Sequence, residues 1–159
     1  MITLAPLDRK DTDRVARIAA RPDQLRFAGT VAEALAEPPE RFDLHEIRKD
    51  ETPVGIFKID RAYGSSYPFA GPRDLGLRAV IIDAAMQGKG VGKAAMSALR
   101  HYLADRYPDF ASVMLTVNMA NPAALSVYRA TGFEDTGEIW PHGDAGPQHV
   151  MRLGLRAGE

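Results

Sequence analysis

The sequence predicts an α/β (α+β) fold, with about four helices on a mixed sheet of about seven strands. Three features carry this prediction: a continuous apolar run at residues 79–82, a helical apolar pattern from Val91 to Tyr102, and a capped helix start at Asn121-Pro122. Strand-like and helix-like segments alternate through the second half of the chain, as in a sheet covered by helices. The length of 159 residues suits one domain, which we expect to span residues 1–159.

The first half of the chain contains short segments with strand patterns. A polar turn at residues 49–53 separates two of them, and residues 63–73 are rich in glycine, serine and proline. We expect residues 63–73 to form a loop, and the sequence leaves open whether this loop covers a site. The expected strands lie at residues 2–4, 41–48 and 54–61.

Two helices are expected between the first and the second of these strands. The first helix has Asp11 as its N-cap, and Pro22 ends its apolar stripe. The second helix begins at Thr30, where the Thr30 hydroxyl and the Glu33 carboxylate form the pattern of a capping box. Pro38-Pro39 ends this second helix, because proline lacks a backbone donor.

The second half of the chain has the stronger patterns. Residues 75–82 alternate and then become continuously apolar, as in a central strand covered on both faces. Apolar residues from Val91 to Tyr102 recur at helical spacing. Another helix begins at Asn121-Pro122 and ends at Gly132, a residue type that favours the left-handed conformation after a helix. Further strands are expected at residues 113–117, 133–140 and 149–155.

Composition and charge exclude several classes of function. The chain has 20 Lys and Arg against 21 Asp and Glu, so no excess of positive charge attracts it to nucleic acid or to a membrane. Cysteine is absent, which excludes disulfides, thiolate metal sites and a cysteine nucleophile. The histidines at 45, 101, 142 and 149 lack metal-ligand spacing, so we expect no metal. No apolar run reaches the roughly 18 residues of a membrane helix, and a cytoplasmic location is expected.

A glycine-rich segment at residues 87–92 lies between the buried strand and the amphipathic helix, an arrangement that binds anions. A nucleotide-binding P-loop is excluded, because Gln87 replaces its first glycine and Ala94 replaces its magnesium-binding hydroxyl. A dinucleotide fingerprint is matched formally at residues 90–95. However, the loop after Ile82 is long for that motif, and the next strand ends without an acidic residue for a ribose.

A third interpretation fits better. The pattern Gln87-x-x-Gly90-x-Gly92 resembles the [RQ]-x-x-G-x-[GA] signature with which the GNAT superfamily of N-acetyltransferases binds the pyrophosphate of coenzyme A. The run Asn121-x-x-Ala124-x-x-x-Tyr128-x-x-x-Gly132-Phe133 resembles the second motif of the same superfamily, and the joint match covers about residues 75–138. Residues 87–90, 132–138 and 150–153 look like the bacterial diamine and spermidine acetyltransferase branch. Ala84 departs from the family pattern, where many members have proline, and so does Gln87, where arginine is commoner.

The resemblance implies a GNAT fold in which two neighbouring parallel strands splay apart to form a cofactor cleft. It implies acetyl-CoA as co-substrate, an N–H near Ile82 that points at the acetyl oxygen, and backbone N–H groups of residues 88–93 around the pyrophosphate. Dimers are common in the family, so a homodimer is compatible with it. The cofactor-binding residues it implies are Val80, Ile81, Ile82, Gln87, Gly88, Lys89, Gly90, Val91, Gly92, Lys93, Asn121 and Tyr128.

Two catalytic residues are expected. By the resemblance, Tyr128 donates a proton to the leaving sulfur, and a phenol with a pKa of about 10 suits a thiol whose pKa is about 8.5. Asp83, at the end of the central strand, is the first candidate for the general base, and Glu46 is a remoter one. Structural roles compete with each assignment: Asn121 also suits a helix cap, Tyr128 a core position, and Asp83 a loop cap.

The function that these features favour is transfer of acetyl from acetyl-CoA to a primary amine, with a small polyamine or diamine as the expected acceptor. Because the chain has no cysteine, the amine must attack the thioester directly in a ternary complex. Trp140 and the turn at residues 141–147 either line the acceptor site or simply pack. A non-catalytic acyl-CoA-binding or sensing domain on the same fold is the alternative function.

Overall fold

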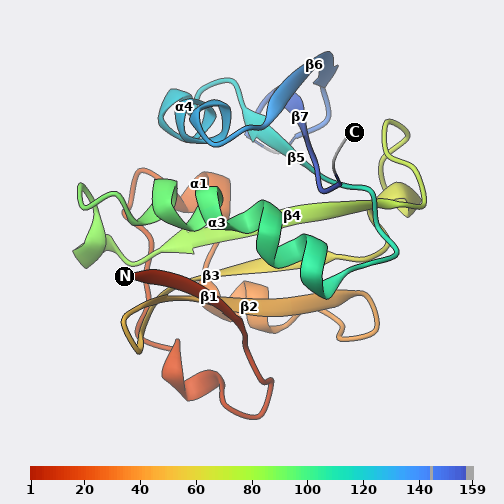
Figure 1. Ribbon diagram of the computed structural model, residues 1–159. Helices are drawn as coiled ribbons and strands as arrows, with labels where there is room; N and C mark the ends of the chain where they lie inside the picture. Colours follow the sequence, from red (N-terminus) through yellow and green to blue (C-terminus); the bar gives the residue numbers. More distant parts are fainter. Residues whose placement is uncertain (144, 157–159) are drawn as a thin grey trace.

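The computed structural model describes residues 1–143 and 145–156 (Figure 1). It has one mixed sheet of seven strands in the order β1-β2-β3-β4-β5-β7-β6, which confirms the predicted fold class. The strands are β1 (Ile2–Pro6), β2 (Phe42–Lys49), β3 (Thr52–Asp60), β4 (Asp74–Ile82), β5 (Ser112–Asn118), β6 (Glu134–Trp140) and β7 (Gln148–Gly154). The helices are α1 (Leu25–Ala28), α2 (Val31–Leu35), α3 (Val91–Arg106) and α4 (Pro122–Ala130).

The N-terminal segment differs from its prediction. The helix expected from Asp11 to Pro22 is wrong: only a 3₁₀ turn at Thr12–Arg14 forms, and the Asp11 side chain caps nothing. Val15 and Ile18 are nevertheless fully buried, so their apolar pattern reflects core contacts of an irregular segment rather than a helix face. The short α1 was not predicted.

Local signals elsewhere predicted the helix ends correctly. At α2, the Thr30 hydroxyl accepts a hydrogen bond from the Glu33 N–H (3.1 Å), and the Glu33 carboxylate accepts one from the Thr30 N–H (2.9 Å), which completes the capping box. At α4, Gly132 has a φ of 107°, and the Phe133 N–H donates to the Tyr128 carbonyl (3.0 Å).

Helices and irregular chain cover the two faces of the sheet. On one face, α3 and α4 pack against a core of strand residues, and the apolar side of α3 is buried as its spacing predicted. Figure 1 shows α3 lying along the sheet in front of β3 and β4. On the other face, the segment from Leu7 to Leu35, which includes α1 and α2, buries Leu44, Ile56 and Ile81.

The sheet opens between β4 and β5. These parallel strands pair only at their beginnings, from Asp74 opposite Ser112 to Gly76 opposite Met114, and then diverge. A bulge bends β4 at the same level, because one residue of β3 faces two of β4 between the pairs Ile56–Ile81 and Lys58–Arg78. Ala79 in this bulge has a φ of 52°, a left-handed conformation that is rare for a residue with a side chain.

No helix within residues 1–143 and 145–156 has both the length and the apolar character needed to cross a membrane.

Candidate active site

Two cavities meet in the opening between β4 and β5. The sheet cavity, of about 570 Å³, is lined by residues of β4, β5 and α1, by residues 63–67 and by residues 140–148. The loop cavity, of about 340 Å³, is lined by residues 86–88 and 90–93 and by α4. Both cavities are lined by Gln24, Ala28, Val80, Ala124 and Tyr128. The opening is therefore one continuous cleft with a junction at these residues.

The loop cavity has the geometry of an anion site. Gly88 and Gly90 adopt left-handed φ values of 76° and 75°, and Gly90 is the N-cap of α3, a helix of 16 residues. Within the described chain, the backbone N–H groups of residues 88–93 donate no hydrogen bond. A Cβ added at Gly88, Gly90 or Gly92 would meet no atom within 4 Å, so open space lies in front of these N–H groups. Free donors at a helix N-terminus fit the pyrophosphate of coenzyme A.

The end of β4 directs one backbone N–H into the cleft. The Asp83 N–H donates to the Val54 carbonyl of β3 (2.8 Å). Successive N–H groups of an extended strand point to opposite edges, so the Ile82 N–H points toward β5, where the pairing has already ended. Val80 and Ile82 line the loop cavity, whereas the Ile81 side chain is buried in the core on the other face. Ile81 can therefore contact a cofactor only through its backbone.

Tyr128 lies at the junction of the two cavities. It is partly buried against the main core, and its ring meets Phe133 edge-on at 5.4 Å. Burial raises the pKa of Tyr128 to about 12, because the surroundings disfavour the phenolate. The hydroxyl therefore stays protonated at neutral pH, as a hydrogen-bond donor should. It is also a weaker acid than the free phenol considered in the sequence analysis.

The other predicted cofactor residues divide between the cavities. Gln87 and Lys93 line the loop cavity together with the glycines, whereas Lys89 lines neither cavity. Asn121 lines the sheet cavity, and its side-chain oxygen also accepts a hydrogen bond from the Ala124 N–H (3.4 Å). Its role as a helix cap is thus confirmed, while its amide group still faces the cleft.

The two candidate bases lie elsewhere. Asp83 lines neither cavity and forms an ion pair with Arg17 at 3.2 Å. Glu46 is buried and pairs with Arg14 at 3.1 Å and with Arg48. The structure does not bring either carboxylate together with Tyr128, so a base role for Asp83 stays a prediction. In the described chain, no three His, Asp or Glu side chains cluster as metal ligands would.

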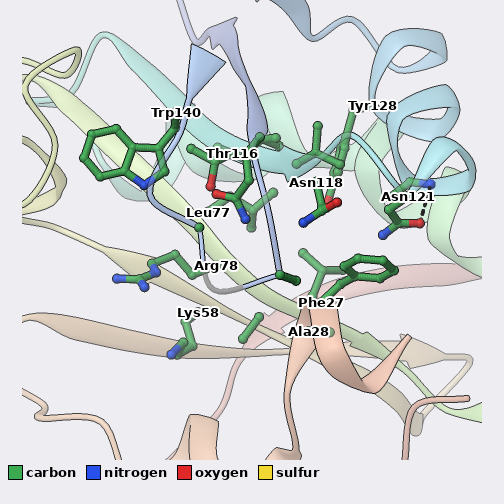
Figure 2. A pocket seen from close by; sticks show the side chains of 18 of the residues that line it. Phe27, Ala28, Lys58, Leu77, Arg78, Thr116, Asn118, Asn121, Tyr128 and Trp140 are labelled. Atoms are coloured by element: carbon green, nitrogen blue, oxygen red, sulfur yellow. Dashed lines mark hydrogen bonds between the residues drawn. The ribbon is translucent and has the colours of Figure 1, made fainter. Parts of the chain in front are cut away.

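The sheet cavity is also lined by Lys58, Arg78 and Asn118, which sequence reasoning did not propose as site residues. Trp140, for which two roles were left open, does both: it lines this cavity, and its ring packs on Tyr67 at 5.0 Å. Figure 2 shows Lys58 and Arg78 on the side of β3 and β4, with Thr116 and Asn118 on the side of β5. One signal was available: Lys58 and Arg78 are charged residues inside otherwise apolar strands.

Comparison with known families and curated proteins identifies related sequences. A family described as "Acetyltransferase (GNAT) family" matches residues 8–133. The uncharacterized N-acetyltransferase YbbJ of Bacillus subtilis (strain 168) is 33% identical over 131 residues, which cover 77% of this chain and 79% of that protein.

Solved structures of acetyltransferases share the fold. Aminoglycoside acetyltransferase AAC(6')-Ib in complex with coenzyme A and kanamycin superposes with a TM-score of 0.77 and 20% identity, covering 97% of this chain and 95% of that chain. Spermidine N-acetyltransferase from Vibrio cholerae in complex with CoA and spermine gives a TM-score of 0.70 and 16% identity, with the same coverage of 97% and 95%. At these identities the likeness establishes the fold.

Proposed function

The chain belongs to the GNAT family of acetyltransferases, and we propose that it transfers the acetyl group of acetyl-CoA directly to a primary amine. The amine nitrogen bonds to the acetyl carbonyl carbon and the carbon–sulfur bond breaks, while the nitrogen loses one proton and the sulfur gains one. The absence of cysteine supports transfer within a ternary complex, because the protein has no thiol to hold the acetyl group.

The position of Tyr128 is the observation that carries this proposal. It is one of the few residues that line both cavities, and the loop cavity has the donors that a pyrophosphate needs. A cofactor held by its pyrophosphate in the loop cavity would reach the sheet cavity only past this junction. The acceptor amine would then bind in the sheet cavity, with the Tyr128 hydroxyl between acetyl-CoA and the amine.

The residues of the cleft supply three contributions. Residues 88–93 bind the cofactor phosphates through their N–H groups. The Ile82 N–H stabilises negative charge as it develops on the acetyl oxygen. Tyr128 donates a hydrogen bond, and then a proton, to the departing sulfur.

The lining of the sheet cavity bears on the chemical class of the acceptor. Sequence similarity favours a diamine or a polyamine. The described lining of the sheet cavity, however, offers no carboxylate to a second ammonium group. The lining therefore supports a primary amine as the acceptor but does not favour a second ammonium group on it.

Replacing Tyr128 with phenylalanine tests the proposal. We expect the rate of CoA release in the presence of amine to fall about 100-fold or more, as for loss of a general acid, with unchanged affinity for acetyl-CoA. Tyr102→Phe is the matched control, because Tyr102 lies on α3, hydrogen-bonds His45 and lines neither cavity. A wild-type rate in Tyr128→Phe would overturn the acid role. Binding of acetyl-CoA without CoA release for any amine in a broad panel would favour a sensing domain instead.

A further inference from the structure

We propose that the acceptor amine also carries a carboxylate, and that Arg78 binds this carboxylate in the sheet cavity. The inference rests on the proposed acetyl transfer and names the class of acceptor: an amino acid or a related amino carboxylate. It is drawn from the charges and the free hydrogen-bond donors around this cavity.

The charged side chains that line the sheet cavity are cationic. Among its described residues are Arg26, Lys58 and Arg78, and none is aspartate or glutamate. A cavity of this kind repels a second ammonium group and attracts an anion. Asp144, which stands between Gly143 and Ala145 in the sequence, lies outside the described residues, and its substitution by asparagine is one of the variants to be measured.

Neighbouring carboxylates form ion pairs with Lys58 and Arg78 but leave the hydrogen-bond donors of Arg78 free. Glu37 pairs with Lys58 at 2.8 Å. Asp60 is fully buried and accepts two hydrogen bonds from Arg41, at 2.8 and 2.7 Å. Arg78 lies 3.8 Å from the same carboxylate, beyond hydrogen-bonding distance.

The guanidinium of Arg78 therefore has a charged neighbour and two aromatic neighbours, but its hydrogen-bond donors have no acceptor within the described chain. It lies over the rings of Phe42 and Tyr67, at 5.8 and 5.9 Å from their centroids, within the range of a cation–π contact. Within the described chain it donates no hydrogen bond. A planar guanidinium with free donors matches a carboxylate in a bidentate pair, and one such cation suits a singly charged anion.

A second free donor faces this cavity from the other strand. Asn118, at the end of β5, is only 5% exposed, and its side-chain oxygen accepts a hydrogen bond from the Ala120 N–H (2.8 Å). Its Nδ2 group has no partner within the described chain. A buried amide donor without a partner is costly unless a ligand uses it, and a carboxylate oxygen is an acceptor that can do so. Figure 2 shows Asn118 and Arg78 on opposite sides of the cavity.

Matched pairs of amines test the acceptor class with the full-length protein. L-Lysine and cadaverine differ only in the carboxylate, and so do L-ornithine and putrescine. We expect acetyl-CoA-dependent CoA release to have a kcat/KM at least about tenfold higher for each amino acid than for its diamine. An equal or higher kcat/KM for the diamines would overturn the inference and leave the acetyltransferase proposal intact. No CoA release with any of these four amines, while another primary amine of the broad panel is acetylated, would also overturn the inference; no release across the whole panel, while acetyl-CoA still binds, would overturn the proposed function.

Variants then assign the preference to Arg78. We expect Arg78→Gln to lower kcat/KM for the amino acids about tenfold or more and to leave the diamines unaffected, so that the preference disappears. Arg78→Lys keeps the positive charge but not the bidentate donor geometry of the guanidinium. It should therefore retain part of the preference for the amino acids. Lys10→Gln, which removes an exposed charge outside the cavity, is the control. An equal loss for both members of each pair, or a diamine activity that Asp144→Asn abolishes, would overturn the role of Arg78.

Discussion

Gln24 and Asn121 exchange two hydrogen bonds between their side-chain amides, across 97 residues of sequence. Gln24 Nε2 donates to Asn121 Oδ1 at 3.3 Å, and Asn121 Nδ2 donates to Gln24 Oε1 at 3.1 Å. Gln24 belongs to the N-terminal segment on one side of the cleft and lines both cavities, whereas Asn121 caps α4 on the other side. This amide pair therefore connects the two sides of the splayed sheet at the place where the cofactor arm is proposed to pass.

Substitutions at Asn121 separate its role as a cap from its role in cofactor binding. Asn121→Ser keeps a capping oxygen and should change the free energy of unfolding little, whereas Asn121→Ala should cost about 1 kcal/mol. If the amide contacts the cofactor, both variants should raise the KM for acetyl-CoA. Urea unfolding and steady-state kinetics measure the two effects. An unchanged KM in Asn121→Ser would show that Asn121 is a cap alone.

The glycines of the loop cavity allow a similar separation. Gly92 lies in the first turn of α3, and a Cβ added there meets only open space. Alanine at 92 should leave stability unchanged or raise it by up to about 1 kcal/mol, because alanine favours the helix. The added methyl group would occupy the space proposed for the pyrophosphate, so the KM for acetyl-CoA should rise about tenfold or more.

Gly90→Ala is the comparison for this experiment. Gly90 has a φ of 75°, so alanine there should cost about 1 to 2 kcal/mol of stability through backbone strain. Thermal unfolding of both variants checks the difference. Wild-type affinity for acetyl-CoA in Gly92→Ala would contradict the proposal that this space holds the cofactor phosphates.

Local chemistry explains how much of the structure could be predicted. The capping box at Thr30, the Asn121-Pro122 start of α4 and the glycine after its end at Gly132 each depend on a few adjacent residues, and each was found correctly. The helix expected after Asp11 was wrong, because burial of Val15 and Ile18 produces the same apolar pattern without a helix.

The acceptor side of the site depends on contacts that no local pattern contains. Arg78 lies beside Lys58 and Asp60 only because a bulge shifts the pairing of β3 with β4. The bonds between Gln24 and Asn121 join segments that the chain separates by most of its length. The glycine-rich part of the loop cavity, by contrast, is one short segment at residues 87–93, so a local pattern is enough to indicate it.

The close approach of Tyr63 to Gly76 gives a prediction about the closed end of the cleft. Gly76 is in the last pair between β4 and β5, and a Cβ added there would overlap the buried Tyr63 ring. Gly76→Ala should therefore lower the free energy of unfolding by about 1 to 3 kcal/mol. In a Tyr63→Ala background the same substitution should cost much less, because the ring is gone. Equal costs in both backgrounds, measured by urea unfolding, would show that this contact does not limit the site.

His45 of β2, which packs against the C-terminal end of α3, predicts how stability depends on pH. His45 is buried, with Nδ1 at 2.7 Å from the Tyr102 hydroxyl and Nε2 at 3.0 Å from the Tyr107 hydroxyl. Tyr107 donates its own proton to Asp43 at 2.6 Å, so Nε2 must donate to Tyr107 and Nδ1 must accept from Tyr102. The neutral ring thus satisfies both nitrogens while it is buried away from water. Burial accordingly lowers the pKa of His45 to about 4, with Arg106 adding to the effect and Asp43 opposing it.

Since this pKa lies below the ordinary value of about 6.5, the unfolded chain takes up a proton first as the pH falls. The contribution of His45 is therefore complete above about pH 6.5 and declines toward about pH 4, with a loss of about 2 kcal/mol between about pH 7.5 and about pH 5. Urea unfolding across this range measures it, and His45→Gln should flatten the profile by this amount. His101→Gln, which removes an exposed histidine of α3, should leave the slope unchanged. A slope in His45→Gln equal to that of the wild type would mean that another group takes up the proton.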